Sequence, residues 1–600
     1  MSAPAPPPAD RSPLLVWGED GSPRSGRFDD VYFSSDDGLA ESRAVFLAGC
    51  GLPEAWVGRT RFTVAELGFG TGLNIVALLD LWAKKGPAEG HLHIVSVEGF
   101  PISQAEAARA LANWPDVASL SGQLLDTWPA SQPGFHRVDL PDLKATLDLL
   151  VGDAADMLGR WAGQADAWFL DGFSPATNPA MWSETVLDAI AARSAPGARI
   201  ATFTVAGAVR RGLSERGFAV AKCPGHGRKR ERLEARLPGL APDAAPPQRV
   251  AVIGGGIAGA ALCRALVAAG QSPVLVEREL PGAGGSGFPA ALVTPRLDAG
   301  DPVIAGLHAQ ALERASDLYR RIPTAVTAET VLQLAQAPRD AARFAKIGAQ
   351  SLWQADVMIP VDAHQASERL AEPVETSGLL MRGAFAIQAR PILDAWLDGV
   401  EQVRSDVARI EPVSSGWSLV DAAGKTVLNI DAVVVASGWG AAALLPDLPL
   451  APVRGQADWV TGTIPMATAW GGYVAPSPSG FLYGATHDRG DVETDVRAAD
   501  TLRNRATLSA RLPELAKGLG ADEGEARAAI RATTPDRLPI CGPVDGEPGL
   551  WVLTGLGSRG FCLAPLLAEH LAAMIAGTPS PLPTDYADRL SPARFTARQT

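Results

Sequence analysis

Two glycine-rich turns stand far apart in this 600-residue chain, and each has the composition of a nucleotide-binding loop. The first reads ELGFGTGLN and has glycines at positions 68, 70 and 72. The second, VAVIGGGIAGAAL, has Gly254, Gly256 and Gly259 in a G-x-G-x-x-G pattern between a strand-like and a helix-like run. Such glycines let the backbone approach a pyrophosphate, whose charge the N-terminus of the following helix stabilises. The spacings differ, so they predict two different ligands.

Acidic residues end the strand-like runs that follow both turns. After the second turn, PVLVE ends at Glu277, which can accept hydrogen bonds from ribose hydroxyls. After the first turn, HLHIVSVE ends at Glu98, LLVGDAADML carries Asp153 and AWFLDGF carries Asp171. Because parallel strands of an open α/β sheet end at one edge, these carboxylates are expected to face one crevice. Taken alone, each acid after the first turn could be a solvated strand end, and Asp171 could simply cap the following turn.

The first turn and its acids resemble those of class I S-adenosylmethionine (SAM) methyltransferases. The resemblance implies that Glu98 binds the ribose of SAM and that Asp153 touches its adenine. Asp171 would then face the methyl group, where a carboxylate can orient an attacking amine and take up its proton. The loop would hold the amino acid end of SAM through the residues Glu66, Gly68, Gly70, Gly72 and Asn74.

The C-terminal part resembles the flavin-dependent amine oxidases of the D-amino acid oxidase and glycine oxidase type. The resemblance lies in IRATTPDRLPICG, residues 530–542, and in GLGSRGF, residues 555–561. It implies that FAD is the ligand of the second turn and that Arg531 binds a substrate carboxylate. Arg296, Arg454, Arg537 and Arg559 are alternatives for that role, and each could instead form an ordinary salt bridge. A late turn would close over the flavin through Gly557, Ser558, Arg559 and Gly560.

The elements around these motifs predict two α/β domains. A Pro- and Ala-rich linker, LPGLAPDAAPPQR, covers residues 237–249 and separates a domain over residues 1–240 from one over 250–600. Alternating strand-like and helix-like runs before the linker predict a doubly wound parallel sheet, the Rossmann-like fold of class I methyltransferases. The second domain begins as an FAD-binding Rossmann unit. Its runs APVRGQADWVTG and GFLYGATHD predict antiparallel strands of a mixed substrate subdomain.

Composition excludes several classes of protein. The chain is 47% hydrophobic and 20% charged, and no run approaches the ~18 uncharged apolar residues that a membrane helix needs. The start, MSAPAPPPADRSP, lacks the pattern of a secretory signal and is interpreted as a loose tail. The five cysteines form no CxxC pair, which favours a reduced, cytoplasmic protein without a metal site. We expect a monomer.

Longer motifs indicate one family. FDDVYFS, WFLDGFSPATNPAMW, ATFTVAGAVRRGL and GRKRE in the first half, with FPAALVTP and GLGSRGF in the second, resemble the bifunctional bacterial enzymes that build 5-methylaminomethyl-2-thiouridine in tRNA. The resemblance implies that the FAD half removes the carboxymethyl group from the wobble uridine and that the SAM half methylates the exposed amine. Two residues depart from the pattern: His226 replaces an expected Phe, and Arg296 replaces an expected Lys.

The net charge of -13 argues against unselective binding to nucleic acid, so a tRNA partner requires a local basic surface. A cluster of basic residues could contact phosphates, and a solvated charged helix face is the alternative. Two other functions stay open: a methyltransferase fused to an oxidase that act on a small amine, and a non-catalytic RNA-binding scaffold. The candidate substrate or RNA contacts are Arg210, Arg211, Arg228, Lys229, Arg230 and Arg296.

Overall fold

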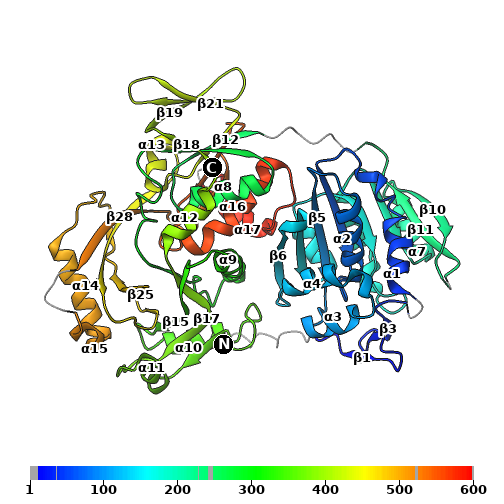
Figure 1. Ribbon diagram of the computed structural model, residues 1–600, viewed down its shortest axis with the longest axis horizontal. Helices are drawn as coiled ribbons and strands as arrows, with labels where there is room; N and C mark the ends of the chain where they lie inside the picture. Colours follow the sequence, from blue (N-terminus) through cyan, green and yellow to red (C-terminus); the bar gives the residue numbers. More distant parts are fainter. Residues whose placement is uncertain (1–10, 35–36, 228, 241–247, 520–523, 597–600) are drawn as a thin grey trace. The chain divides into compact units, whose positions relative to one another are not determined.

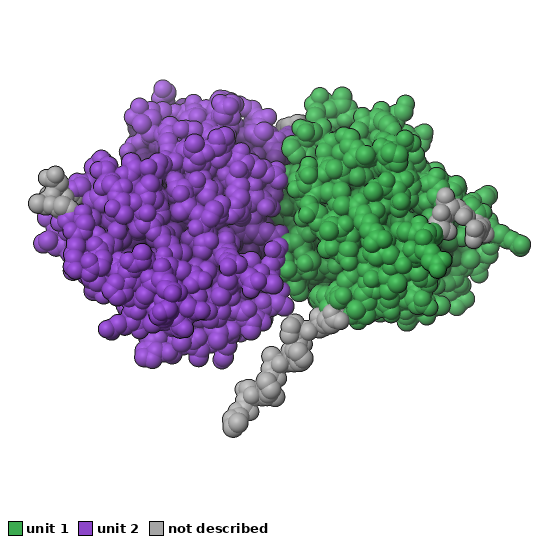
Figure 2. All heavy atoms as spheres, turned by 60° about the horizontal axis from the view of Figure 1, so that its bottom comes forward, with its two compact units in different colours: residues 1–246, 579–584 green, residues 247–578, 585–600 purple. Residues whose placement is uncertain are grey.

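The structure, a computed structural model, describes residues 11–34, 37–227, 229–240, 248–519 and 524–596 (Figure 1). The chain divides into two compact units, which Figure 2 distinguishes by colour. Unit 1 holds residues 1–246 and 579–584, and unit 2 holds residues 247–578 and 585–600. The division at 246/247 falls within the Pro-rich segment. The return of residues 579–584 to unit 1 has no signal in the sequence. Residues 1–10 of the segment interpreted as a loose tail, and Arg228, lie outside the described residues.

Unit 1 is built on an eight-stranded sheet. Its central strands run parallel, as predicted, whereas the edge strands β6, β10 and β11 are antiparallel to their neighbours. In spatial order the strands are β10 (Ala219–Pro224), β11 (Glu231–Arg236), β9 (Ser194–Thr202), β8 (Ala165–Leu170), β4 (Arg61–Leu67), β5 (His91–Glu98), β7 (Ala145–Val151) and β6 (Gly134–Leu140).

Successive residues of a strand point to opposite faces of the sheet. Both faces of this sheet carry apolar residues, and helices cover both. Val64 and Phe169 join one core, which includes the buried side of α2 (Leu73–Lys85) and residues of α4 (Ala118–Asp126). Their neighbours Ala65 and Trp168 join the other core, with α5 (Ala154–Arg160), α6 (Glu184–Ala192) and α7 (Gly207–Glu215). The prediction of a doubly wound sheet is therefore confirmed for its parallel centre.

A short N-terminal segment is added to this fold. Strands β1 (Leu15–Trp17), β2 (Pro23–Ser25) and β3 (Asp30–Val31) form a small antiparallel sheet. We call residues 28–33, around β3, the strap. The strap leads to α1 (Gly38–Glu41) and to a π-helical turn over Ser42–Leu47, and α3 (Gln104–Leu111) lies later in unit 1.

Unit 2 begins with a six-stranded sheet in which β29 alone is antiparallel to its neighbour. The helix α8 (Ile257–Ala268) follows the second glycine turn and packs against α16 (Gly560–Ala576) and α12 (Ala389–Leu397). The other face is covered by a three-stranded sheet of β19 (Val407–Pro412), β20 (Trp417–Asp421) and β21 (Thr426–Ile430). The six strands, in spatial order, are β18 (Glu401–Arg404), β13 (Ser272–Glu277), β12 (Arg249–Ile253), β22 (Ala432–Val435), β30 (Leu550–Thr554) and β29 (Ile540–Pro543).

A second, ten-stranded sheet completes unit 2. The two runs predicted to be antiparallel strands pair in that sense, as β23 (Ala451–Thr461) and β26 (Gly480–Gly484). The other strands are β14 (Ala291–Val293), β15 (Val326–Leu334), β16 (Met358–Val361), β17 (Gly378–Ile387), β24 (Thr468–Ala469), β25 (Tyr473–Ser477), β27 (Asp488–Arg489) and β28 (Glu525–Thr533). The remaining helices are α9 (Pro302–Arg320), α10 (Asp340–Gly348), α11 (Ala363–Leu370), α13 (Ala441–Leu444), α14 (Ala498–Arg511), α15 (Pro513–Lys517), α17 (Thr584–Leu590) and α18 (Ala593–Thr596).

A buried ion-pair cluster ties three of the unit 2 helices together. Glu569 on α16 accepts hydrogen bonds from Arg314 on α9, at 2.6 to 3.1 Å, and also contacts Arg264 on α8. Removing one partner of such a buried pair leaves a charge without compensation, so the cluster constrains how these helices pack.

Candidate active sites

The first glycine turn needs its glycines for both conformation and space. Gly68, Gly70 and Gly72 all have positive φ, at 94°, 51° and 76°. A Cβ on Gly68 would lie 2.8 Å from the carbonyl oxygen of Asp171, and one on Gly70 would lie 3.1 Å from Cδ1 of Tyr32. The turn therefore passes between the backbone at Asp171 and the ring of Tyr32, where residues with a side chain would be strained or would clash.

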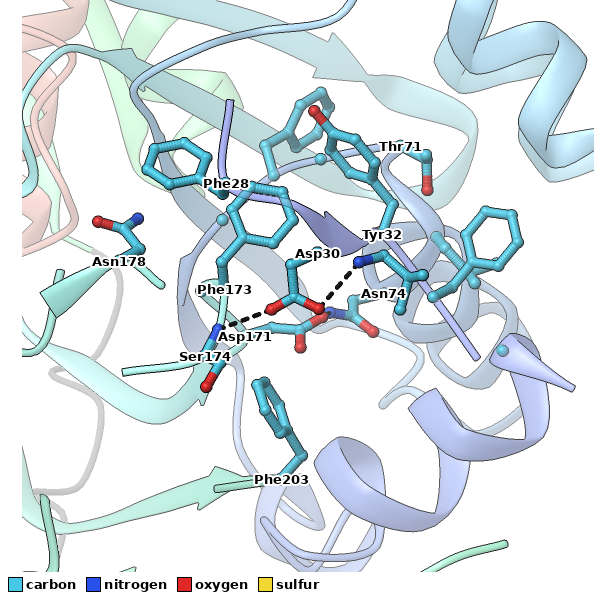
Figure 3. Close-up of a pocket in the computed structure, with 18 of the residues that line it drawn as sticks. Phe28, Asp30, Tyr32, Thr71, Asn74, Asp171, Phe173, Ser174, Asn178 and Phe203 are labelled. Carbon is cyan, nitrogen blue, oxygen red and sulfur yellow. Dashed lines mark hydrogen bonds between the residues drawn. The ribbon is translucent and has the colours of Figure 1, made fainter. Parts of the chain in front are cut away.

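A cavity of about 1050 Å³ opens beside this turn. It is large enough for a nucleoside-sized ligand together with part of a second one. Aromatic rings from the strap and from two strand ends line it. They are Phe28, Tyr32, Phe173 and Phe203, which Figure 3 labels, and Phe33. The predicted residues that it brings together are Gly68, Gly70, Asn74, Glu98, Asp153 and Asp171, whereas Glu66 and Gly72 lie outside its lining.

Asn74 joins the two acids at the inner end of the cavity. Its Nδ2 donates to Oδ2 of Asp171 at 2.7 Å and to Oε1 of Glu66 at 3.0 Å. Its Oδ1 accepts from the Ser42 hydroxyl at 2.6 Å, and Ser96 donates to the second oxygen of Glu66. Because each side-chain polar atom of Asn74 already has a protein partner, its geometry fits a residue that positions Asp171 better than a direct cofactor ligand.

Burial shifts the ionisation of both acids. Desolvation raises the pKa of Asp171 to about 7, although the bond from Asn74 and the charge of Lys229 act in the opposite direction. Desolvation likewise raises the pKa of Glu66 to about 8, against the hydrogen bonds from Ser96 and Asn74. A carboxylate whose pKa lies near neutrality is suited to accept and release a proton at physiological pH.

The two acids predicted to bind SAM occupy strand ends, as expected. Glu98 ends β5, and its carboxylate accepts hydrogen bonds from the amides of Gly70, at 3.0 Å, and Phe100, at 2.8 Å. Asp153 follows β7 and caps α5 by accepting from Ala155 and Asp156. Both carboxylates line the cavity, so both can reach a ligand held there.

The strap contains site residues that the sequence did not single out. Asp30 lines the cavity and accepts a hydrogen bond from the Ser174 amide at 3.0 Å. Phe28 and Tyr32 pack on Phe173, with ring centroids 5.1 and 5.3 Å apart. All three strap residues belong to FDDVYFS, a stretch whose resemblance to one family was its only signal, because no periodic pattern links it to the strand ends.

The second glycine turn has the geometry of a dinucleotide site. Gly254 has φ 109°, and a Cβ there would lie 2.6 Å from Cα of Ser437. A Cβ on Gly259 would overlap the carbonyl oxygen of Gly254, so this residue must be glycine for α8 to approach the turn. Gly256, by contrast, has only the Ser286 hydroxyl nearby, 3.2 Å from such a Cβ. Glu277 accepts from the Gly255 amide at 2.6 Å, which parallels Glu98 and Gly70.

Arg531 lies on β28, and its side chain packs against the paired strand β23. Its guanidinium occupies the space that a side chain at Gly455 of β23 would need, and it donates to the carbonyl oxygen of Thr486 at 3.3 Å. Burial lowers the pKa of Arg531. Its charge acts on Tyr473 of β25, a residue that packs on the small apolar cluster around Ala290 and that sequence reasoning missed. This arrangement leaves a half-buried cation beside a tyrosine, which suits a carboxylate ligand.

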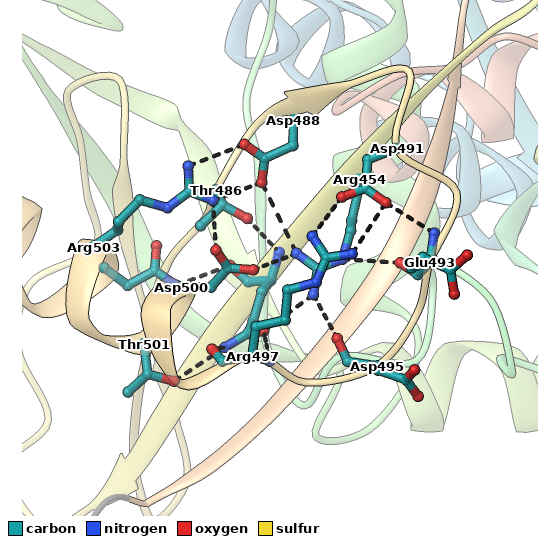
Figure 4. A network of polar contacts seen from close by, with 12 residues as sticks. Arg454, Thr486, Asp488, Asp491, Glu493, Asp495, Arg497, Asp500, Thr501 and Arg503 are labelled. Atoms are coloured by element: carbon teal, nitrogen blue, oxygen red, sulfur yellow. Dashed lines mark hydrogen bonds and ion pairs between the residues drawn. The ribbon is translucent and has the colours of Figure 1, made fainter.

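The alternative carboxylate-binding arginines are differently placed. Arg454 is fully buried in a polar network, where it pairs with Asp500 and donates to the carbonyl oxygens of Glu493 and Asp495 (Figure 4). Its guanidinium is thus used within the protein. Arg559 donates to Thr294, and Arg296 lies 3.5 Å from Asp298. Arg537 is exposed, with φ 60°.

The late turn joins β30 to α16 as predicted. Gly557 has φ 56°, and its amide donates to the carbonyl oxygen of Ala532 at 3.0 Å. Ser558 is exposed, and Gly560 begins α16. The turn therefore contacts the strand that carries Arg531.

The candidate RNA contacts separate into two groups. Arg210 and Arg211 are exposed on α7, and Arg230 is exposed just before β11. Lys229 instead reaches the cavity, where its Nζ donates to Glu41 at 2.8 Å and lies over the Phe203 ring. The cluster is thus not one charged helix face, because it combines a helix with a segment between two edge strands.

Both glycine turns fit the cofactors implied by the sequence. Each is a cradle of backbone amides that a Cβ would partly fill, and each has an acid from the next strand at its edge. Among the described residues, no group of three or more His, Cys, Asp or Glu is arranged to hold a metal ion. None of the helices in the described part of the chain is long and apolar enough to cross a membrane.

Two family models match separate parts of the chain. Residues 115–238 match the model "S-adenosyl-L-methionine-dependent methyltransferase", and residues 249–574 match "FAD dependent oxidoreductase". The chain is 55% identical to the "tRNA 5-methylaminomethyl-2-thiouridine biosynthesis bifunctional protein MnmC" of Caulobacter vibrioides, over 97% of each chain. The protein of the same name from Maricaulis maris is 42% identical, over 98% of this chain and 96% of its own.

Solved structures share the fold of unit 2. Glycine oxidase from Geobacillus kaustophilus aligns with a TM-score of 0.50 and 23% identity, over 56% of this chain and 96% of its own. L-proline dehydrogenase from P. horikoshii aligns with a TM-score of 0.51 and 16% identity, over 58% and 98%.

Proposed function

This chain belongs to the family of bifunctional tRNA 5-methylaminomethyl-2-thiouridine biosynthesis proteins, and we propose from that premise that it modifies the wobble uridine of tRNA in two steps. The FAD unit removes the carboxymethyl group of 5-carboxymethylaminomethyl-uridine. The SAM unit then methylates the primary amine that remains. The observation that carries the proposal is the 55% identity over 97% of the chain, together with two intact cofactor turns.

The oxidation is assigned to unit 2. FAD, when bound, would supply the acceptor for the hydride that the carbon next to the substrate carboxylate loses, and the substrate nitrogen would lose its proton to water. The substrate becomes an imine, and water then releases glyoxylate and leaves the primary amine. Arg531 binds the carboxylate of the substrate, and Tyr473 stands beside it as a hydrogen-bond donor. Their common role is to orient the arm so that its C–H bond faces the cofactor.

The methyl transfer is assigned to unit 1. SAM, when bound, supplies an electrophilic methyl group on a sulfonium. Asp171, poised by Asn74, accepts the proton that the amine must lose, because its pKa of about 7 suits that exchange near neutral pH. The rings of Phe28, Tyr32 and Phe173 form an apolar wall on which a nucleobase can stack.

The RNA itself is expected to contact both catalytic units by their surfaces. Arg210, Arg211 and Arg230 are exposed and can contact phosphates, and a tRNA substrate implies that the protein acts in the cytoplasm. Lys229 is assigned to the cavity instead, because it is paired with Glu41 there.

The test is nucleoside mass spectrometry of tRNA that carries the carboxymethylaminomethyl group, after incubation with the purified, FAD-loaded protein. Without SAM, we expect loss of the carboxymethyl mass, and with SAM, the further gain of one methyl group. A flavin-containing, folded protein that leaves the tRNA unchanged would overturn the proposal and favour a small amine as the substrate.

A further inference from the structure

We propose that Asp30 is a second carboxylate of the methyl-acceptor site, which binds the substrate amine opposite Asp171 and makes the site favour a bare aminomethyl arm over one that carries a carboxylate. The inference rests on the proposed function and extends it to a residue of the strap. It follows from how Asp30 is held, from its neighbours and from the charge of the cavity.

Two backbone amides hold the Asp30 carboxylate in place. Its Oδ1 accepts from the Val31 amide at 2.9 Å, and its Oδ2 accepts from the Ser174 amide at 3.0 Å. Ser174 lies in the loop that follows β8 and Asp171, so the strap and this strand end are joined directly. Figure 3 labels both acids among the residues that line the cavity, and they are near enough for the charge of Asp30 to act on Asp171. Both oxygens of Asp30 keep free lone pairs for a ligand.

Aromatic contacts fix the strap on both sides of Asp30. Phe28, two residues before it, packs on Phe173 at 5.1 Å, and Tyr32, two residues after it, packs on the same ring at 5.3 Å. Phe28 also meets Phe100, which follows the SAM-side acid Glu98, at 5.4 Å. Since these rings anchor the strap, Asp30 is a fixed part of the cavity wall.

The described part of the cavity lining is strongly acidic. Its only lysine and arginine side chains are Arg24, which pairs with Asp29, and Lys229, which pairs with Glu41. Against them stand the carboxylates of Glu19, Asp20, Asp30, Glu41, Glu98, Asp153 and Asp171.

The negative charge of Asp30 disfavours ionisation of Asp171 and so raises the pKa of Asp171. The other groups that interact with Asp171 are Asn74, Lys229, Glu41 and Glu66, and Lys229 is already bound to Glu41. Two neighbouring carboxylates favour a cationic, hydrogen-bond-donating ligand. A primary ammonium group has that chemistry.

The reaction balances with these two residues in separate roles. The ammonium gives one proton to Asp171 and keeps N–H groups that donate to Asp30. The nitrogen lone pair then forms the new C–N bond while the C–S bond of the sulfonium breaks, and its electron pair stays on sulfur. Asp30 stabilises the positive charge that develops on nitrogen. A carboxymethyl group on the same nitrogen would place a third carboxylate beside Asp30 and Asp171, so the site disfavours it.

The test compares Asp30→Asn with the matched control Asp29→Asn in the full-length, FAD-loaded protein. The Asp29 side chain is 93% exposed and lies outside the cavity lining, and its partner Arg24 keeps a hydrogen bond to the Asp29 carbonyl oxygen in this variant. Methyl transfer from SAM to tRNA bearing the aminomethyl arm is measured across pH. We expect Asp30→Asn to lower kcat/KM by about 10- to 100-fold, as a lost hydrogen bond to a charged group does. We also expect the rising limb of its pH profile to move to lower pH, because the pKa of Asp171 falls.

An Asp30→Glu variant separates charge from support of the loop. It keeps the negative charge, so its pH profile should stay like that of the wild type even where its rate falls. Equal profiles for Asp30→Asn and wild type would overturn the inference and leave Asp30 as a structural strap residue. Wild-type protein that fails to methylate this tRNA would instead overturn the proposed function. The FAD-unit oxidation rate and the affinity for SAM show that each variant is folded.

The preference for the bare arm is tested in an Arg531→Met background, in which the carboxymethyl arm should persist. There, Asp30→Asn is expected to increase, by about tenfold, the yield of the N-methylated carboxymethyl nucleoside detected by mass. No increase over the Arg531→Met single variant would overturn the role of Asp30 in selecting the substrate.

Discussion

The side-chain amide of Asn74 donates to the carboxylate of Asp171 over 2.7 Å while its other hydrogen is bound to Glu66 at 3.0 Å. This links the start of α2 to the end of β8 and orients the acid that faces the cavity. The cofactor turn and the candidate proton acceptor are thus parts of one hydrogen-bonded unit, which explains why Asn74 follows the last glycine so closely.

Asp171 is expected to be needed for methylation alone. Asp171→Asn keeps the size of the side chain and removes its basicity, so methyl transfer should fall by about 10²- to 10⁴-fold, the usual worth of a general base. Removal of the carboxymethyl group should be unchanged. The control is Asp188→Asn, whose exposed carboxylate pairs with Arg216 on the outside of unit 1. Equal loss of both reactions would contradict a model of two separate sites.

The pH profile of methylation should depend on Asn74. Asp171 accepts a proton only as a carboxylate, so kcat/KM should be low well below pH 7 and rise through the pKa of about 7. The bond from Asn74 lowers that pKa, and Asn74→Ala removes it. The pKa should then rise, and the rising limb should move to higher pH, opposite to the shift expected for Asp30→Asn. Rates measured with pre-formed aminomethyl tRNA at saturating SAM test this, and an unmoved limb would show that Asn74 does not act through Asp171.

Two glycines of the second turn should respond differently to the same substitution. Gly256→Val adds a Cβ whose nearest neighbour is the Ser286 hydroxyl, at 3.2 Å, the end of a side chain that can shift, so it should block FAD without unfolding unit 2. Gly259→Val would overlap the Gly254 carbonyl and should lower the melting temperature as well. Flavin absorbance and thermal unfolding distinguish the two effects. Gly256→Val should still methylate pre-formed aminomethyl tRNA, and retained flavin would mean that this turn does not bind FAD.

Arg531 and Arg454 lie on paired strands, but we expect substitutions at the two positions to have different effects. Arg531→Met removes the proposed carboxylate partner, so KM for the carboxymethyl substrate should rise at least tenfold while the melting temperature changes little. Arg454→Met leaves Asp500 buried without its partner and should cost about 3–5 kcal/mol of stability. Steady-state oxidation kinetics and denaturant unfolding measure these outcomes. A stability loss in Arg531→Met as large as in Arg454→Met would assign Arg531 to the structural network.

Parts of the site could be read from local sequence because they depend on local geometry. The glycines of both turns are required by positive φ or by close backbone approach, and such positions accept few other residues. Glu98 and Glu277 end strands, and parallel strands bring their carboxyl ends to one edge. The prediction for the first sheet missed its antiparallel edge strands, because edge pairing depends on long-range contacts that the alternation of residues does not encode.

The sequence by itself determined two cofactor turns, the acids that follow them and the family of the chain, since these depend on short spacings within single β-turn-α units. Only the tertiary structure decided which charged groups meet. Asp30 accepts a hydrogen bond from Ser174, which is 144 positions away in the chain. Arg454 forms an ion pair with Asp500, whereas Arg531 on the adjacent strand does not. The physical reason is that burial, charge pairing and packing of side chains are set by contacts between distant segments, and these contacts decide whether an acid or an arginine is available to a ligand.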